Sequence, residues 1–212
     1  MKDSSQPTRE RILQAAGKLF HRDGIRAISV DAIAEKAGVT KRTLYYHFRS
    51  KDDLIAAHLQ ARDEPNLVLF KRWFEETKGD TARKVAGIFC HLAQSARSAK
   101  WKGCGFLRTS VELINLPGHP ALVAARAHKK RVEDWLASTF MEAGAGSDAL
   151  PLARQIMLLL DGSFAVVLLH RDPSYMETAA VAAADLIKSR LTAPPEHDFA
   201  TDKSSQLNES RP

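Results

Sequence analysis

Six residues between positions 41 and 47 carry side chains suited to binding nucleic acid. Cations neutralise phosphate charge, while hydroxyl, phenol and imidazole groups donate or accept hydrogen bonds at phosphates and base edges. Leu44 and Phe48 stand four residues apart, so they share one helix face and are expected to point inward. The other side chains then form a polar outer surface: Lys41, Arg42, Thr43, Tyr45, Tyr46 and His47.

The elements that position this surface are two short helices separated by a tight turn at Gly38. Ser29 is expected to cap the first helix, and Thr40 the second. Glycine adopts the left-handed conformation that ends a helix at low cost, which is the role expected of Gly38. The stretch from Ser29 to Phe48 therefore predicts a helix-turn-helix that reads DNA with its second helix.

A further helix is predicted before this pair, from Thr8 to a glycine cap at Gly24. Ser50 and Asp53 match a capping box that opens a fourth helix directly after the pair. The first three helices are expected to bury one apolar set together: Leu13, Phe20, Ile28, Ile33, Val39, Leu44 and Phe48.

The net charge is concentrated in the same part of the chain. Residues 1–51 hold eleven Lys and Arg against five Asp and Glu, a net charge of +6, whereas residues 52–212 hold twenty of each. A basic surplus confined to the helix-turn-helix favours a polyanionic partner there and a neutral task elsewhere. Double-stranded DNA is the expected partner.

The segment resembles the DNA-binding domain of the TetR (tetracycline-repressor-like) family of bacterial regulators in the order of its motifs: GI-x-A-x-S-V-x-x-IA-x-x-AGV, T-K-R-T-LYYHF and R-S-K-D-D-L. The resemblance covers about the first sixty residues. It implies an all-helical homodimer that binds a palindromic operator and releases it when a small molecule enters the C-terminal domain. It also implies that the first turn of the second helix faces base edges, whereas the tyrosines, the histidine and a later lysine mostly hold phosphates. The positions that it places at DNA are Ser29, Thr40, Lys41, Arg42, Thr43, Tyr45, Tyr46, His47 and Lys51.

Single residues of this set also have purely structural explanations. Lys51 fits the ordinary first turn of a helix, and the His47 imidazole can simply satisfy a backbone carbonyl. Tyr45 and Tyr46 lie about 100° apart on a helix, so both cannot be core residues. Tyr45 shares a face with Lys41 and is the better candidate for a phosphate ligand.

Beyond residue 60 the pattern predicts packing helices. Pro65 is expected to kink a long fourth helix or divide it in two. Large side chains in the middle of the chain are expected to leave a hollow for a mainly hydrophobic ligand, although each alone is more typical of a core. The candidate lining is Phe70, Trp73, Phe89, Trp101, Phe106, Trp135 and Phe164, with Glu112, His91 or Arg108 as the polar groups.

The last two helices predict a homodimer through Leu152 to Leu191. Leu152–His170 is apolar nearly all round, and the helix after it is rich in small alanines, of which Ala183 is expected to face outward. Two such helices are most readily buried by a second copy of the chain, as a four-helix interface. Asp161 within the apolar run is expected to cap or pair at that interface, with a ligand contact as the alternative.

Other classes of protein find little support. The polar start and the lack of an eighteen-residue uncharged apolar run favour a soluble, cytoplasmic protein with no membrane partner. Cys90 and Cys104 suit a reducing compartment and match no zinc spacing with the histidines, and Cys90 falls at a core-like helical position. No nucleophile elbow, phosphate loop or zinc-protease motif is present, so we expect no enzyme activity, cofactor or metal.

The sequence therefore predicts an all-α protein of about nine helices. We expect a helix-turn-helix DNA-binding domain at 1–50, a ligand-binding and dimerisation domain at 51–192 and a disordered tail at 193–212. The predicted function is a repressor that binds a palindromic operator as a homodimer and is released by a small-molecule effector. A DNA-binding regulator or activator without a ligand is the alternative, and an enzyme is the third possibility.

Overall fold

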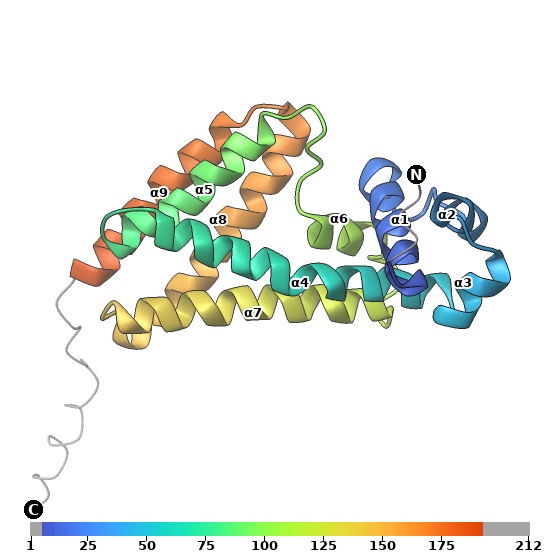
Figure 1. The fold of residues 1–212 in the computed structure, drawn as a ribbon. Coiled ribbons are helices and arrows are strands. Elements are labelled where there is room, and N and C mark those ends of the chain that lie inside the picture. The colour runs from blue at the N-terminus through green and yellow to red at the C-terminus, as the bar shows by residue number, and fades with distance from the viewer. Residues whose placement is uncertain (1–5, 193–212) are drawn as a thin grey trace, which may run out of the picture.

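The computed structural model describes residues 6–192, and the tail predicted at 193–212 lies outside the described residues. As predicted, the described part is all helical. Its elements are α1 (Thr8–Asp23), α2 (Val30–Ala37), α3 (Lys41–His47), α4 (Lys51–Glu76), α5 (Thr81–Ala96), α6 (Gly105–Glu112), α7 (Pro120–Glu142), a short 3₁₀ helix η1 (Gly146–Asp148), α8 (Ala149–His170) and α9 (Ser174–Thr192). Figure 1 shows α1–α3, called the reader below, at one end of the molecule and α5, α8 and α9 gathered at the other, with α4 and α7 running side by side between them.

The sequence signals at the helix-turn-helix are confirmed. Ser29 Oγ accepts a hydrogen bond from the Ala32 amide at 3.1 Å, and Thr40 Oγ1 accepts one from the Thr43 amide at 3.0 Å. Gly38 has the left-handed φ of 67°, and its amide donates to carbonyls in the last turn of α2. These caps fix both sides of the turn, so α3 leaves α2 in a defined direction.

One apolar core joins the reader to the elements that follow it. Ile12, Ile33 and Leu44 are completely buried. Of the seven residues predicted for this core, Leu13 and Val39 lie at its partly buried edge. The same core continues into α4, α6 and α7 through Leu54, Leu59, Phe106 and Ala121. The predicted boundary at residue 50 falls within this continuous packing and stays a prediction.

Helix α4 continues through Pro65 and is not divided there. Proline lacks an amide hydrogen, so the carbonyl four residues earlier loses its helical partner. Both Pro65 and Ala61, which carries that carbonyl, are exposed, so water can replace the missing donor. As a result, a single helix of 26 residues runs from the reader into the C-terminal part of the protein.

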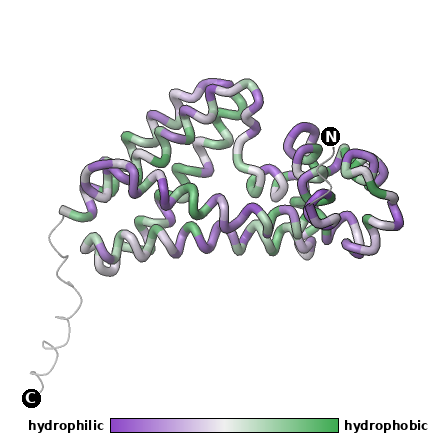
Figure 2. The backbone as a smooth tube through the Cα atoms, viewed as in Figure 1, coloured by the Kyte–Doolittle hydropathy of each residue, from purple (hydrophilic) through white to green (hydrophobic). Residues whose placement is uncertain are grey.

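A second core, called the C-terminal core below, lies between the second half of α4 and helices α5, α7, α8 and α9. Its completely buried side chains include Phe140, Met176 and Ile187. The stretch Gly146–His170 is the one helical segment of the described chain whose length and composition would suit a membrane span, yet α8 within it packs against α7 and α9. Figure 2 shows hydrophilic and hydrophobic residues alternating along the helices, the pattern expected when each helix buries one side.

Candidate nucleic-acid interface

The predicted polar surface of α3 faces solvent. Tyr46 is 85% exposed and Tyr45 is 44% exposed, so both phenols are available to a partner. On the opposite side, Leu44 is completely buried and Phe48 nearly so, as predicted. The exposed members of the predicted DNA-binding set are Ser29, Thr40, Lys41, Arg42, Tyr45 and Tyr46, and the half-buried members are Thr43, His47 and Lys51.

Lys41 is held in place across the turn. Its Nζ lies 3.0 Å from Oδ2 of Asp31 in the first turn of α2, and both side chains are more than half exposed. The hydrogen bond with Asp31 raises the pKa of Lys41, so the ammonium stays charged. At the same end of α3, the hydroxyls of Thr40 and Thr43 lie 2.8 Å apart and share a hydrogen bond. The first turn thus offers a cation and two hydroxyls, which are groups that bind base edges and phosphates.

Two arginines of α1 stabilise the reader internally. Arg11 donates from Nη2 to the carbonyls of Ala37 and Gly38 at 3.3 and 3.4 Å, which ties α1 to the turn. The Arg9 guanidinium lies over the Phe48 ring, 5.0 Å from its centroid. In the sequence both arginines contribute only net charge, because their partners stand 26 or more positions away and leave no local signal.

Lys51 and His47 are half-buried and lie at the edge of the exposed surface of α3. Lys51 is in the first turn of α4, and burial lowers its pKa while Asp52 and Glu112 act in the opposite direction. The His47 ring packs edge-on against Tyr46 with centroids 5.2 Å apart. The role of each at phosphate stays a prediction.

Helix α6 is hydrogen-bonded to the loop that connects α1 to α2. The Glu112 carboxylate accepts hydrogen bonds from the amides of Ile25 and Arg26 at 2.9 and 3.1 Å. One turn earlier on α6, Arg108 donates to the His21 carbonyl at 3.2 Å. The loop presents two backbone donors that need an acceptor, and the carboxylate supplies it. Glu112 therefore has structural partners within the chain, and its predicted contact with a ligand stays a prediction.

Polar contacts join α4 to α7 at two levels. At the start of α4, Asp52 lies 3.2 Å from Nε2 of His119, the residue that caps α7. Deeper in the molecule, the buried Asp63 carboxylate accepts a hydrogen bond from Nδ1 of His128 at 2.9 Å and also pairs with Arg131. Burial lowers the pKa of His128 to about 4, so its imidazole is neutral at pH 7. The carboxylate only accepts, so Nδ1 carries the ring hydrogen.

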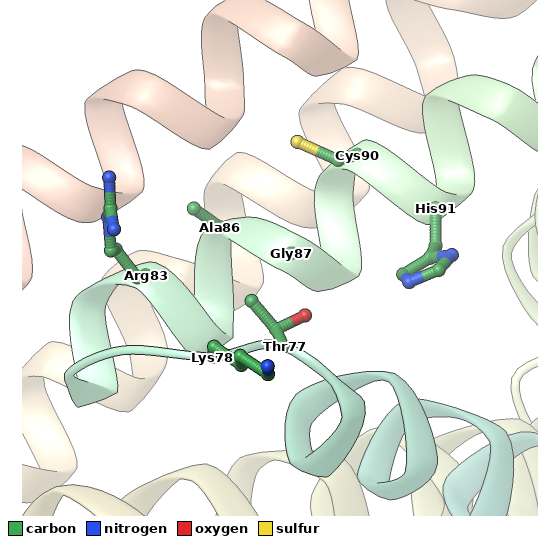
Figure 3. Close-up of a pocket in the computed structure, with 7 residues that line it drawn as sticks. All are labelled: Thr77, Lys78, Arg83, Ala86, Gly87, Cys90 and His91. Carbon is green, nitrogen blue, oxygen red and sulfur yellow. The ribbon is translucent and has the colours of Figure 1, made fainter.

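Two open grooves are described in the C-terminal part. The larger, of about 530 Å³, lies where the α4–α5 connection passes α5. Figure 3 shows that Cys90 and His91 project from α5 in different directions, although both line this groove. The smaller groove, of about 430 Å³, lies between α6, α7 and α8.

Cys90 is exposed, so the core position predicted for it is wrong. The buried face of α5 runs through Ile88, Phe89 and Leu92, and Cys90 falls on the other side of the helix. Among the residues that the structure describes, no three metal-ligating side chains gather in one place.

The aromatic residues predicted to line a cavity pack in cores and against one another. Phe89 and Phe106 are almost completely buried. The Phe106 ring stacks on His128 with centroids 3.7 Å apart, and Trp101 stacks on Phe164 at 6.1 Å. The remaining candidates, Phe70, Trp73 and Trp135, belong to the C-terminal core. None of the seven predicted aromatic residues lines either groove, whereas His91 lines the larger one. A ligand contact for the aromatic residues stays a prediction.

Comparison with known proteins finds relatives among bacterial transcriptional regulators. A family model described as "Bacterial regulatory proteins, tetR family" matches residues 12–58. The HTH-type transcriptional regulator UidR of Escherichia coli K12 is 39% identical over 75 residues, which make up 35% of this chain and 38% of that protein. The match thus spans less than half the length of this curated relative.

Solved structures match over much more of the chain. A TetR-family transcriptional regulator from Streptomyces coelicolor has a TM-score of 0.75 and 29% identity, covering 87% of this chain and 96% of that one. A TetR transcriptional regulator from Streptomyces avermitilis has a TM-score of 0.71 and 30% identity, covering 85% of this chain and 99% of that one.

An all-helical chain whose N-terminal helix-turn-helix exposes cations and phenols is a DNA-binding transcriptional regulator, and this class of protein is not enzymatic. The chain belongs to the TetR family of bacterial regulators, since it shares 30% identity with nearly the full length of a solved member. Regulators of this family are soluble and act on DNA.

Proposed function

We propose that the protein is a cytoplasmic repressor that binds a palindromic operator as a homodimer and releases it when a small, mainly hydrophobic ligand binds the C-terminal domain. The observation that carries the proposal is the exposed surface of α3, where Lys41, Tyr45 and Tyr46 stand opposite a buried apolar side. A helix of this kind fits the major groove. The first turn of α3 is assigned to base edges, and the tyrosines, His47 and Lys51 are assigned to phosphates.

The homodimer is supported by an apolar stripe along α8. Leu158 and Leu169 are 74% and 79% exposed, and Gly162 and Ala165 between them are exposed as well. On α9, Val181 is 62% exposed. Residues at this spacing share one helix face, and a second copy of α8 packed on it would remove the apolar surface from water. The proposed interface is therefore α8 and α9, from Leu152 to Leu191.

Two residues of these helices have partners within one protomer. Ala183 is completely buried, because its small side chain lies where α9 packs on its neighbours. The outward position predicted for Ala183 is wrong, and a charge there would disturb folding rather than test the dimer. Asp161 pairs with Lys129 of α7, so its ion-pair partner lies within the same chain.

Helix α4 is the proposed route for release. It begins in the reader core and ends in the C-terminal core, with residues in both. Because the helix is continuous, a tilt of its C-terminal half changes the position of the reader. A ligand acts at this distance only by binding one arrangement of the dimer better than the other. The proposed domains are accordingly 1–50 for DNA binding and 51–192 for ligand binding and dimerisation.

The packing of the aromatic residues favours one alternative, a DNA-binding regulator or activator without a ligand. Phe89 and Phe106 are almost completely buried and Phe164 is 5% exposed, so each already fills its own space. The ligand-released repressor and the ligand-free regulator differ in whether a small compound that binds the protein also weakens operator binding. A compound that raises the thermal midpoint and also lowers operator affinity excludes the alternative.

Selection of bound duplexes from a random pool, followed by footprinting, tests the operator proposal. We expect a protected palindrome with half-sites about 34 Å apart or a multiple of that distance. The logarithm of affinity should fall with the logarithm of salt concentration, with a slope of about −0.9 per phosphate contact. Sedimentation should show a dimer at micromolar concentration. A stable monomer, or no protected palindrome at any salt concentration, contradicts the proposal.

A further inference from the structure

The groove of about 430 Å³ between α6, α7 and α8 combines an apolar lining with a group of charges. One apolar side chain comes from each helix: Leu107 from α6, Ala125 from α7 and Met157 from α8. The Ser110 hydroxyl of α6 also lines the groove and is hydrogen-bonded to the Phe106 carbonyl. The charged lining consists of Arg126, Lys129, Lys130, Glu133 and Asp161.

These charges are unevenly compensated. Lys130 is shared by the carboxylates of Glu133 and Asp134, and Lys129 pairs with Asp161 across the groove. Arg126 has no ion-pair partner among the described residues. It stands three positions before Lys129, so the two cations lie on the same side of α7. This end of the groove therefore carries an excess of positive charge next to apolar side chains.

We propose that the groove binds a small apolar carboxylate, held by Arg126 and Lys129 at its charged end and by Leu107, Ala125 and Met157 along its apolar body. An arginine guanidinium can hold a carboxylate through two parallel hydrogen bonds, which gives direction as well as strength. This proposal rests on the ligand-released function proposed above and names the ligand class and the site.

Helix α6 connects this groove to the reader by a second route besides α4. Leu107 and Ser110 line the groove, whereas Arg108 and Glu112, four positions apart, share another face of α6. Arg108 bonds to the last turn of α1, and Glu112 bonds to the loop that follows it. The helix has only eight residues and is preceded and followed by non-helical segments, so it can shift as a unit. A ligand that moves α6 changes the hydrogen bonds that Glu112 accepts from the reader.

Calorimetric titration with phenylacetate and octanoate tests the site, with the uncharged phenylacetamide and octanamide as matched controls. Each carboxylate should bind at least about ten-fold more tightly than its amide, since hydrogen bonds between charged groups are the stronger kind. Arg126→Gln should abolish that preference. Arg83→Gln removes a cation from the other groove and should leave it unchanged. Equal binding of acid and amide, or a preference that survives Arg126→Gln, overturns the proposal.

Amide hydrogen exchange at Ile25 and Arg26 tests the route through α6, because their amides donate to Glu112. Phenylacetate should accelerate exchange at both amides in the wild type. In Glu112→Gln the exchange should already be faster, and the ligand should change it little. Exchange that the ligand does not alter in the wild type overturns this route.

Two further outcomes distinguish a failure of the groove proposal from a failure of the ligand-released function on which it rests. Carboxylate binding that appears only in the monomeric variant Leu158→Glu would identify a second copy of the chain as the occupant of the groove and overturn the proposal. Release of the operator by uncharged hydrophobic compounds, with no carboxylate binding, would overturn the groove proposal and leave the ligand-released function standing.

Discussion

Acid should destabilise this protein through His128. Its imidazole is 3% exposed, donates to Asp63 and stacks on Phe106. Burial lowers the pKa of His128 to about 4, and the Lys129 charge acts in the same direction. The Asp161 carboxylate raises the pKa of His128, but it does not outweigh burial. The Asp63 carboxylate, which accepts the ring hydrogen, is itself paired with Arg131. The folded protein therefore holds the ring neutral well below the pH at which a free histidine becomes charged.

The size of the effect follows from the two pKa values of His128. The unfolded chain takes up the proton near pH 6.5, whereas the folded protein takes it up near pH 4. Between these values the unfolded state binds more protons, so the stability from this group is complete above pH 6.5 and falls as the pH falls toward 4. The loss amounts to about 3 kcal/mol at 1.36 kcal/mol for each pKa unit. His58 of α4, whose pKa burial also lowers to about 4, adds a further loss in the same window.

Urea unfolding at pH 7.5 and pH 4.5, at one protein concentration, measures this loss. His128→Leu should reduce the difference in unfolding free energy between the two pH values by about 2 to 3 kcal/mol. His170→Gln, at the exposed end of α8, is the matched control and should keep the wild-type difference. The comparison between pH values separates the titration from the packing loss that the substitution causes at both. Equal losses of stability on acidification in His128→Leu and in the wild type would show that His128 is not the group that titrates.

Three further predictions concern DNA binding, assembly and packing. Lys41→Ala should change sequence preference, whereas Lys51→Ala should weaken all duplexes about equally and reduce the salt slope of the dimer by about 1.8, which is about 0.9 for each protomer. Binding isotherms on selected and scrambled duplexes distinguish the two effects, and unchanged binding in both variants argues against the assigned contacts. Leu158→Glu places a charge on the apolar stripe, so sedimentation at micromolar concentration should show monomers. Ala183→Glu places a charge in the core of one protomer and should instead lower the thermal midpoint of unfolding. A stable Leu158→Glu dimer argues against the proposed interface. Gly87→Ala should cost about 1–3 kcal/mol, because the added Cβ would lie 2.2 Å from the hydroxyl of the threonine that follows α4; a denaturant midpoint at or above that of the wild type would show that this joint adapts.

The helix-turn-helix was predictable because its signals act over a few residues. The Ser29 and Thr40 hydroxyls each accept from an amide three positions later, and Gly38 ends the helix that it follows. Leu44 and Phe48 reveal their shared face through their spacing alone. Caps, glycine turns and apolar spacing depend little on the rest of the fold, and the structure agrees with all three here.

The C-terminal predictions were weaker because they depended on partners far along the chain. Cys90 sits beside Phe89 and was assigned to the core, but the crossing of α5 with its neighbours buries the other side of the helix. Ala183 was assigned to the surface, but the packing of α9 buries it completely. Periodicity shows that a helix has two sides, and only the packed neighbours decide how wide the buried side is.

The class of this protein follows from the sequence of one short stretch, because Ser29 to Phe48 contains both caps, the glycine turn and the polar helix surface. Tertiary structure alone decided how the DNA-binding end is attached to the rest. The carboxylate of Glu112 reaches amides 86 and 87 positions earlier, and Asp63 meets His128 across 65 positions. Contacts over such separations depend on where whole helices cross, and no short stretch of sequence encodes that geometry.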